Sequence, residues 1–330
     1  MRKHRLGRTG LEVSEISYGC GGTAGLMVRG SHEEQCEVVA KALDYGINMF
    51  DTSPTYGAGR SETNLGKVLA ELGSSPIVST KIDLSVDDLE DVDAAIQRSV
   101  QRSQDRLGRN CLDVLYLHSR VGRVRDVAGR VLSVADVLGP GGVADILDGL
   151  KRKGLVGAIG FTGLGHTESI IEVLESDRFD VFQAYYNLIN PSAAMPTVAA
   201  WRAQDYGQMI QIGERRDIGV VGIRVLAAGA LSETQELHRF AKAYSSLSKA
   251  EVDADRVKAQ AFRSILPPGM SMAQFALRFA LSEPRLDTVL VGVSERAHLD
   301  EAVAASASGP LHQEQVDSVI ARFRELYEMA

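Results

Sequence analysis

The sequence predicts a (β/α)8 barrel of parallel strands, and three observations lead to this fold class. Eight short apolar segments follow one another along the chain, and each is followed by a segment with helical spacing of apolar residues. A chain of 330 residues is the size of one such barrel. Three consecutive apolar segments also end on ionisable residues, as expected where the ends of barrel strands converge on one face.

The chain begins with a predicted β-hairpin over residues 2–13, whose turn is the glycine-containing stretch 7–10. The eight barrel strands follow. They are predicted at residues 16–18, at the segments that end on Asp51, Lys81 and His118, and at residues 156–161, 181–184, 219–223 and 288–291. An N-terminal hairpin therefore precedes a complete set of barrel strands.

Helices are predicted between the strands, and two of them begin with a capping box, in which a serine and a side chain three residues later satisfy free backbone amides. These pairs are Ser31 with Glu34 and Ser271 with Gln274. The other predicted helices are residues 61–72, 87–107, 143–153, 168–175, one ending near 216, 297–305 and an extra C-terminal helix at 313–329. Residues 119–142 remain unassigned, and residues 227–268 form an excursion that is partly helical. No linker is visible, so we expect one domain over residues 1–330.

Composition excludes several classes of protein. The net charge of −7 disfavours a nucleic-acid partner, which requires a basic face. Three cysteines without CxxC spacing predict neither a disulfide framework nor a zinc site, and none of the seven histidines forms an HxH pair, so no metal is expected. No signal peptide and no apolar run of about 18 residues is present, which predicts a cytoplasmic protein without a membrane partner.

Four residue types that move protons stand at or just beyond the predicted strand ends: Asp51, Tyr56, Lys81 and His118. A tyrosine has an ordinary pKa near 10, a neighbouring ammonium favours the phenolate, and a carboxylate can fix that ammonium in place. A histidine can donate a hydrogen bond to a substrate oxygen. The set suits proton transfer at a carbonyl or alcohol oxygen, and a redox step would need a hydride from a cofactor.

The stretch DTSPTYGAGRSETNLG, from Asp51 to Gly66, resembles the central motif of the aldo-keto reductase family. The segments STK and LYLH, which end at Lys81 and His118, are similar to the next two catalytic strand ends of that family. The resemblance continues through IGFT at 159–162, FQAYYN at 182–187 and VLVG at 289–292, and so covers nearly the whole chain. It implies a (β/α)8 barrel and a nicotinamide cofactor extended across the carboxyl ends of the strands.

The resemblance also implies a role for each residue. Tyr56 would be the general acid for carbonyl reduction, or the base for the reverse reaction, with its pKa lowered by Lys81. Asp51 would pair with Lys81, and His118 would orient the carbonyl of a small aldehyde, ketone or sugar. The arginines at 120, 123 and 125 could suit a polar or anionic substrate.

For the cofactor, NADP or NAD with a slight preference for NADP, the resemblance implies contacts along the whole rim. Gly22 and Thr23 would lie near the nicotinamide ribose, and Thr162 and Gln183 would bind the carboxamide. Ile223 or Arg224 stands where relatives carry a stacking aromatic residue, and Arg296 could meet a 2′-phosphate. The remaining implied cofactor contacts are Asp51, Gly163, Leu226, Gly292, Val293, Ser294 and Glu301.

Several alternatives stay open at this point. An NAD-linked aldose 1-dehydrogenase that forms a lactone falls in the same class of enzyme. A lyase would use Lys81 to form a Schiff base, and a non-catalytic, cofactor-sensing subunit would only bind the nucleotide. The stretch 60–62 could be simple helix-capping chemistry, with Ser61 as the N-cap. The GxGxxA pattern at 19–24 is interpreted as a loop because the helix cap lies later, at Ser31.

Overall fold

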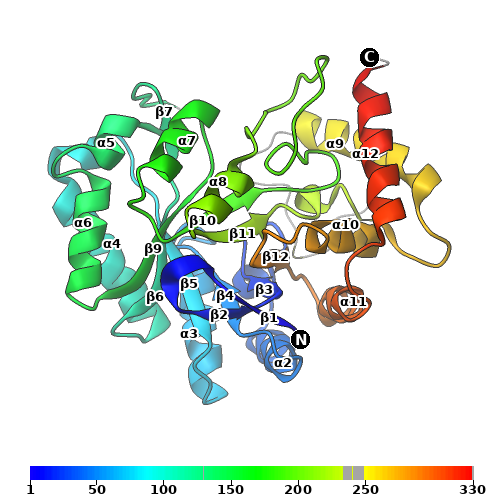
Figure 1. Cartoon of the computed structure of the whole chain (residues 1–330). Coiled ribbons are helices and arrows are strands. Elements are labelled where there is room, and N and C mark those ends of the chain that lie inside the picture. Colours follow the sequence, from blue (N-terminus) through cyan, green and yellow to red (C-terminus); the bar gives the residue numbers. More distant parts are fainter. Residues whose placement is uncertain (129, 233–239, 241–248, 329–330) are drawn as a thin grey trace.

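A computed structural model of the chain describes residues 1–128, 130–232, 240 and 249–328. Eight parallel strands close into a barrel, and helices surround it (Figure 1). In barrel order the strands are β3 (Ile16–Gly19), β4 (Met49–Asp51), β5 (Ile77–Ile82), β6 (Leu112–Leu117), β9 (Val156–Thr162), β10 (Val181–Tyr185), β11 (Gly219–Ile223) and β12 (Thr288–Gly292). For the strands whose bounds were predicted, the observed bounds agree with the predicted ones to within about two residues. The predicted fold class is confirmed.

The helices that follow the strands bury one apolar stripe each against the barrel. They are α2 (His32–Asp44), α3 (Arg60–Glu71), α4 (Val92–Leu107), α6 (Val143–Arg152), α7 (Thr167–Glu175), α8 (Met209–Arg215), α10 (Met272–Leu281) and α11 (Arg296–Ala307). The capping boxes at Ser31 and Ser271 are both formed. The additional helices are α1 (Leu26–Arg29), α5 (Val134–Leu138), α9 (Lys249–Ala261) and α12 (Gln313–Glu328). Residues 233–239, 241–248 and 329, which fall in the predicted excursion and terminal helix, lie outside the described residues.

One local interpretation, Ser61 as the N-cap of α3, is wrong. The helix begins at Arg60 after Gly59, whose φ of 87° favours glycine. Inside the helix, the Ser61 hydroxyl donates to the carbonyl of Cys20 at 3.0 Å. Its neighbour Glu62 is fully buried and accepts from Thr80 and Arg106, each at 2.6 Å. This stretch therefore holds α3 to the barrel and to α4, and does not cap the helix.

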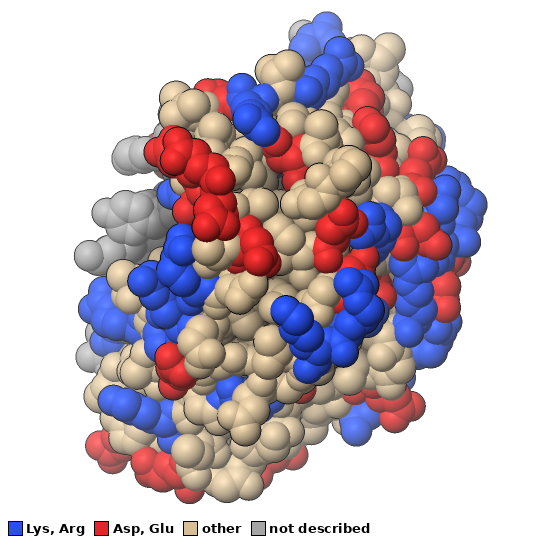
Figure 2. All heavy atoms as spheres, turned by 90° about the vertical axis from the view of Figure 1, so that its left-hand side faces the viewer, with Lys and Arg blue, Asp and Glu red and all other residues tan. Residues whose placement is uncertain are grey.

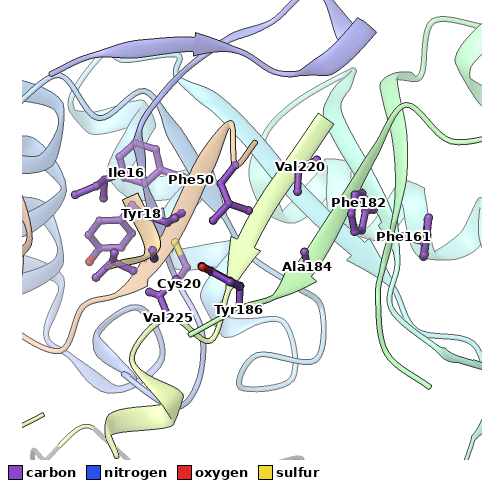
Figure 3. Close-up of a cluster of buried hydrophobic side chains, with 14 of the residues drawn as sticks. Ile16, Tyr18, Cys20, Phe50, Phe161, Phe182, Ala184, Tyr186, Val220 and Val225 are labelled. Atoms are coloured by element: carbon purple, nitrogen blue, oxygen red, sulfur yellow. The ribbon is translucent and has the colours of Figure 1, made fainter. Parts of the chain in front are cut away.

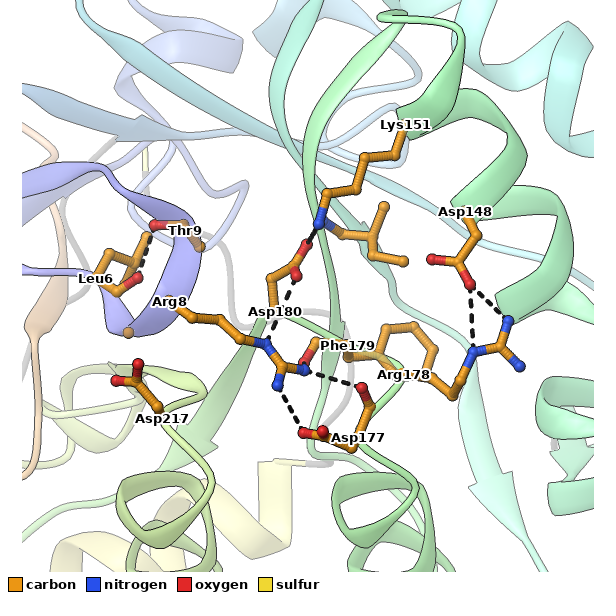
Figure 4. Close-up of polar contacts among 12 residues, drawn as sticks. Leu6, Arg8, Thr9, Asp148, Lys151, Asp177, Arg178, Phe179, Asp180 and Asp217 are labelled. Atoms are coloured by element: carbon orange, nitrogen blue, oxygen red, sulfur yellow. Dashed lines mark hydrogen bonds and ion pairs between the residues drawn. The ribbon is translucent and has the colours of Figure 1, made fainter.

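The amino-terminal end of the barrel is closed by the hairpin of β1 (Lys3–Arg5) and β2 (Glu12–Ser14), which pair antiparallel as predicted. Leu6 lies between them, is fully buried and packs in a cluster with residues of the barrel strands. Arg8 anchors the turn, because its guanidinium donates to Asp177 at 2.6 Å and lies 3.7 Å from Asp180 (Figure 4). Asp180 in turn accepts from Lys151 on α6 at 2.6 Å. A ligand must therefore enter at the carboxyl end.

Large aromatic side chains pack around and between the strands (Figure 3). Tyr18 and Phe50 stack with ring centroids 5.2 Å apart, and Phe161 and Phe182 stack at 6.0 Å. All four are buried, and each buried aromatic side chain removes a large apolar area from water. The packing makes the barrel a rigid scaffold for the side chains at its rim.

The segment that the sequence left unassigned, 119–142, folds into a small parallel sheet and a helix. Strand β7 (Arg120–Gly122) pairs with β8 (Val131–Ser133), and α5 follows directly. Arg125 donates to the carboxylate of Asp136, and Asp136 also forms a capping box with Ser133. These contacts join the loop after β7 to the start of α5, and Arg120 opens β7 three residues after the end of β6.

The face that carries α5 and α6 presents basic and acidic side chains close together (Figure 2). Among the ion pairs of these helices, Arg178, which follows α7, donates to Asp145 of α6 at 2.8 Å and to Asp148 of α6 at 2.6 Å.

Of the helices that the structure describes, none combines the length and the apolar character that a bilayer crossing requires.

We expect Gly66→Ala to destabilise the protein, although alanine is normally the better helix former. A Cβ at Gly66 would lie 2.5 Å from the carbonyl oxygen of Arg106 and 2.9 Å from the backbone of Leu107, so α3 and α4 would have to separate. The expected loss is about 1–3 kcal/mol in the free energy of unfolding, measured by urea denaturation.

The matched control is Gly149→Ala in α6, where the nearest atom to a new Cβ is the flexible end of Arg152 at 3.8 Å. This variant should gain up to about 1 kcal/mol in stability. Equal effects of the two substitutions would contradict the close approach of α3 to α4.

Candidate active site

The strands β4, β5 and β6 place three predicted catalytic residues at the carboxyl end of the barrel. Asp51 is the last residue of β4, Lys81 lies near the end of β5, and His118 follows β6. The register sets Asp51 beside Ser79, two residues before Lys81. Tyr56 comes from the loop that links β4 to α3. The four residues predicted from the sequence thus come from three neighbouring strand ends and the loop after the first of them.

Lys81 and Asp51 form a buried ion pair. The Nζ atom of Lys81 donates to Oδ2 of Asp51 at 2.5 Å and to the carbonyl of Thr52 at 2.7 Å. Lys81 is 1% exposed and Asp51 is 3% exposed. Burial lowers the pKa of Lys81, but the charges of Asp51 and Tyr56 outweigh burial and raise this pKa above its ordinary value. Lys81 is therefore a fixed ammonium group.

Tyr56 lies directly beside this ammonium, with Nζ of Lys81 4.8 Å from the centre of the ring. Burial raises the pKa of the Tyr56 phenol and Lys81 lowers it, and the net result is a pKa above the ordinary value of 10. The expectation that Lys81 would leave Tyr56 with a lowered pKa is therefore corrected: the direction of the Lys81 effect holds, but burial is larger. At neutral pH Tyr56 carries its proton.

His118 is connected to Asp51 through two polar side chains. The hydroxyl of Thr162 lies 2.9 Å from Nδ1 of His118 and donates to Oε1 of Gln183 at 3.1 Å, and Nε2 of Gln183 donates to Oδ1 of Asp51 at 3.0 Å. A carboxylate only accepts, so the amide orientation of Gln183 is determined by Asp51. The Thr162 hydroxyl has one proton, which it gives to Gln183, so Nδ1 of His118 must be the donor. In this state Nε2 is an acceptor, suited to a hydroxyl group of a ligand.

The pKa of His118 is lowered to about 3 by burial, with smaller contributions from Lys81 and Arg224. We expect this lowered pKa to make the free energy of unfolding depend on pH. An imidazole with a lowered pKa in the folded state contributes stability above the unfolded pKa of about 6.5, and loses it as the pH falls towards 3. Between pH 6.5 and 5, His118 should account for a loss of up to about 2 kcal/mol in the free energy of unfolding.

The measurement is urea denaturation at pH 7.5 and pH 5 for the native chain and for His118→Gln. The difference between the two pH values should shrink in the variant, because glutamine does not titrate. The same difference in both proteins would mean that the imidazole titrates alike in the folded and unfolded states.

A cavity of about 1230 Å³ opens above these residues. It exceeds the usual range of about 300–1,000 Å³ for a small-molecule site, so an extended ligand and a second molecule both have room. Asp51, Tyr56 and His118 line it, whereas Lys81 is buried behind them. The predicted cofactor contacts that line the cavity are Gly22, Thr23, Gln183, Ile223, Arg224, Leu226, Gly292, Ser294 and Glu301.

Four predicted cofactor contacts do not line the cavity: Thr162, Gly163, Val293 and Arg296. Thr162 lies behind His118, as described above. Arg296 faces away to other acids, and its guanidinium lies 3.1 Å from Glu37 and 3.5 Å from Asp300. The neighbour of Arg296 that lines the cavity is Glu295.

The sequence did not identify the wall formed by the loop after β10, which brings Asn190, Gln204 and Tyr206 to the cavity. Tyr206 stacks on Tyr185 with ring centroids 5.1 Å apart, and both line the cavity. In the sequence, the one indication of this wall was the position of the loop after a barrel strand, because loops after the carboxyl ends of the strands build the site in this fold.

Outside the cavity, His32, Cys36 and Glu71 bring their ligand atoms within 4.8 Å of one another. His32 lies 2.7 Å from Glu71, and both side chains are more than half exposed. The hydrogen bond between His32 and Glu71 accounts for the closeness of these side chains.

Comparison with known proteins agrees with the barrel fold. The model of the Aldo/keto reductase family matches residues 15–322. L-galactose dehydrogenase of Arabidopsis thaliana is 26% identical over 309 residues, covering 91% of this chain and 86% of the relative. L-glyceraldehyde 3-phosphate reductase of Escherichia coli O157:H7 is 25% identical over 327 residues, covering 92% and 87%. The structure of aldo-keto reductase AKR11C1 from Bacillus halodurans (holo form) has a TM-score of 0.73 at 20% identity, covering 98% of this chain and 96% of that one. The chain belongs to the aldo/keto reductase family of oxidoreductases.

Proposed function

We propose that the protein transfers hydride between a nicotinamide nucleotide and the carbon of an aldehyde, ketone, alcohol or sugar hemiacetal. The observation that carries the proposal is the protonated phenol of Tyr56 beside the buried Lys81–Asp51 pair at the base of the cavity. This arrangement supplies a proton next to an open space large enough for cofactor and substrate. The activity is that of an NAD(P)-dependent alcohol dehydrogenase or carbonyl reductase.

The residues around the cavity fit a dinucleotide. The amino-terminal residues of α10, Ser271, Ala273 and Gln274, line the cavity, and a helix amino terminus favours a phosphate group. Backbone at Gly22 faces open space, since a Cβ there would have no atom within 4 Å. Gln183 offers an amide to a carboxamide. When bound, the nicotinamide would supply or accept the hydride.

Tyr56 then has a defined task. During reduction, negative charge develops on the substrate oxygen, and the phenol gives its proton to that oxygen. The phenolate that remains is stabilised by the ammonium of Lys81, which Asp51 and Thr52 hold in place. During oxidation the same groups act in reverse. His118 stays neutral, and its Nε2 can accept from a hydroxyl group of the substrate, whereas it has no proton to donate to the carbonyl oxygen.

We propose NAD, rather than NADP, as the cofactor, which reverses the slight preference drawn from the sequence. The supporting observation is that Arg296 is engaged by Glu37 and Asp300, whereas Glu295 and Glu301 line the cavity. A carboxylate can accept from the hydroxyls of an adenosine ribose, but it repels a 2′-phosphate.

The test is fluorescence titration with NADH and NADPH, followed by aldehydes and aldoses assayed with both nucleotides. NADH should bind at least about tenfold more tightly, a difference of about 1.4 kcal/mol. Tighter binding of NADPH would reject the cofactor assignment. Nucleotide binding without turnover of any substrate would reject the proposed catalytic activity. The hypothesis of a non-catalytic, cofactor-sensing subunit would then remain.

A second candidate is an NAD-linked aldose 1-dehydrogenase that forms a lactone. It is favoured by the acceptor state of Nε2 of His118, which suits a hydroxyl of a cyclic sugar, and one relative is named L-galactose dehydrogenase. In the same assay, aldoses with NAD⁺ should then yield lactone faster than aldehydes are reduced. A Schiff-base lyase is disfavoured, because Lys81 is charged, buried and ion-paired.

A further inference from the structure

We propose that the substrate carries an anionic group, a carboxylate or a phosphate monoester, which Arg120 and Arg224 bind at the catalytic end of the cavity. This inference rests on the proposed function and names the class of substrate that this site would accept. It is argued from the position of the two arginines, their partners and the charge around them.

Both arginines occupy strand ends at the rim. Arg224 follows β11 directly, Arg120 opens β7 two residues after His118, and all three residues line the cavity. The two guanidinium groups act on the same neighbour, because each lowers the otherwise raised pKa of the Tyr206 phenol. Arg224 also lowers the pKa of His118. Both cations therefore lie near Tyr206 at the cavity wall, and Arg224 also lies near His118.

Arg120 differs from its neighbours in the chain. Arg123, Arg125 and Arg130 all face carboxylates: Glu168 at 3.9 Å, Asp136 at 2.9 Å and Asp83 at 3.4 Å. Arg120 has no hydrogen bond or ion pair with any residue that the structure describes. Of the four arginines in residues 119–133, the one that lines the cavity is thus the one without a protein carboxylate.

Arg224 is held at the cavity by an unusual backbone. Its φ of 59° lies in the left-handed region, which is unfavourable for a residue with a side chain and is common at ligand sites. The side-chain amide of Asn187 donates to the carbonyl of Arg224 at 2.9 Å and fixes this turn. The structure therefore maintains a strained backbone at the residue that carries a cation to the cavity.

Two of the four carboxylates that line the cavity are paired with lysines, and one of these, Asp255, also acts on Tyr206 and raises the pKa of its phenol. Asp51 is paired with Lys81, and Asp255 lies 3.3 Å from Lys258. Of the other two lining carboxylates, Glu295 precedes α11 and Glu301 lies within it. An anion at the catalytic end would meet Arg120 and Arg224, and a guanidinium matches carboxylate and phosphate oxygens with two parallel hydrogen bonds.

The experiment compares substrates that differ by the charged group. Succinic semialdehyde is paired with butanal, and glyceraldehyde 3-phosphate with glyceraldehyde, all with saturating NADH or NADPH. The anionic member of at least one pair should show a kcat/KM at least about tenfold higher, and which pair does so identifies carboxylate or phosphate. In Arg120→Gln the ratio should fall towards one, mainly through the KM of the anionic substrate.

The matched control is Arg123→Gln, which removes a neighbouring cation that is paired with Glu168 and does not line the cavity. It should keep the native ratio. Calorimetric titration with succinate and with inorganic phosphate gives a readout without turnover. The affinity for the preferred anion should fall about tenfold in Arg120→Gln and stay native in Arg123→Gln.

The inference is overturned if neutral and anionic members are turned over equally well, or if the ratio survives in both Arg120→Gln and Arg224→Gln. If no substrate is turned over, the proposed function fails. The anion titration still decides whether this end of the cavity binds anions. Equal affinities of the native chain and of Arg120→Gln for succinate and for phosphate would refute anion binding at Arg120.

Discussion

Replacement of Tyr56 by phenylalanine should lower kcat for carbonyl reduction by about 10²–10⁴-fold, the range that a general acid or base contributes. The variant keeps the ring beside Lys81 and removes the hydroxyl that we propose protonates the substrate oxygen. Binding of NADH should change less than about twofold, because the role proposed for the phenol is at the substrate oxygen and not at the phosphates or the adenosine. Steady-state kinetics with an aldehyde and fluorescence titration of the nucleotide measure the two effects separately.

Tyr45→Phe is the control for loss of a phenol outside the cavity, where the hydroxyl of Tyr45 donates to Asp300 at 2.7 Å. Its turnover should match that of the native chain. If Tyr56→Phe also retained near-native turnover, the proton would have to come from elsewhere, and the assignment of Tyr56 would fail.

The barrel was predictable because each buried parallel strand is a short apolar run, which is visible in the sequence. Helix starts were predictable where the capping chemistry is local, as at Ser31 and Ser271. At Ser61 the same local reasoning failed, since the helix begins earlier, at Arg60 after a glycine with positive φ, and the Ser61 hydroxyl donates to the distant carbonyl of Cys20. The three-residue strands β7 and β8 are too short to show any periodicity.

The site divides in the same way. The ends of the predicted strands indicate which residues meet at the rim of the barrel. Asp51, Lys81 and His118 could therefore be chosen from the sequence. The net pKa of Tyr56 could not, because it depends on how much surrounding chain excludes water. Likewise, nothing local distinguishes Arg120 from Arg123, and only the folded β7 shows which of them lines the cavity.

Replacement of Lys81 by methionine should lower the free energy of unfolding by about 3–5 kcal/mol at neutral pH and also abolish most turnover. Asp51 would remain buried as a carboxylate without its counter-ion, although Ser79 and Gln183 still donate to it. The loss should shrink as the pH falls, since an unpaired buried carboxyl has a raised pKa and is neutral at low pH. Urea denaturation at pH 7.5 and pH 4.5 measures both effects.

The double variant Asp51→Asn with Lys81→Met separates stability from chemistry. Removal of both charges should recover stability to within about 1–2 kcal/mol of the native chain, because replacement of a whole buried pair is often nearly neutral. An asparagine can still accept from Ser79, so that hydrogen bond survives. Turnover should stay as low as in Lys81→Met, because no ammonium remains to stabilise the phenolate of Tyr56. Recovery of turnover together with stability would mean that the pair serves the fold alone and that Tyr56 acts without it.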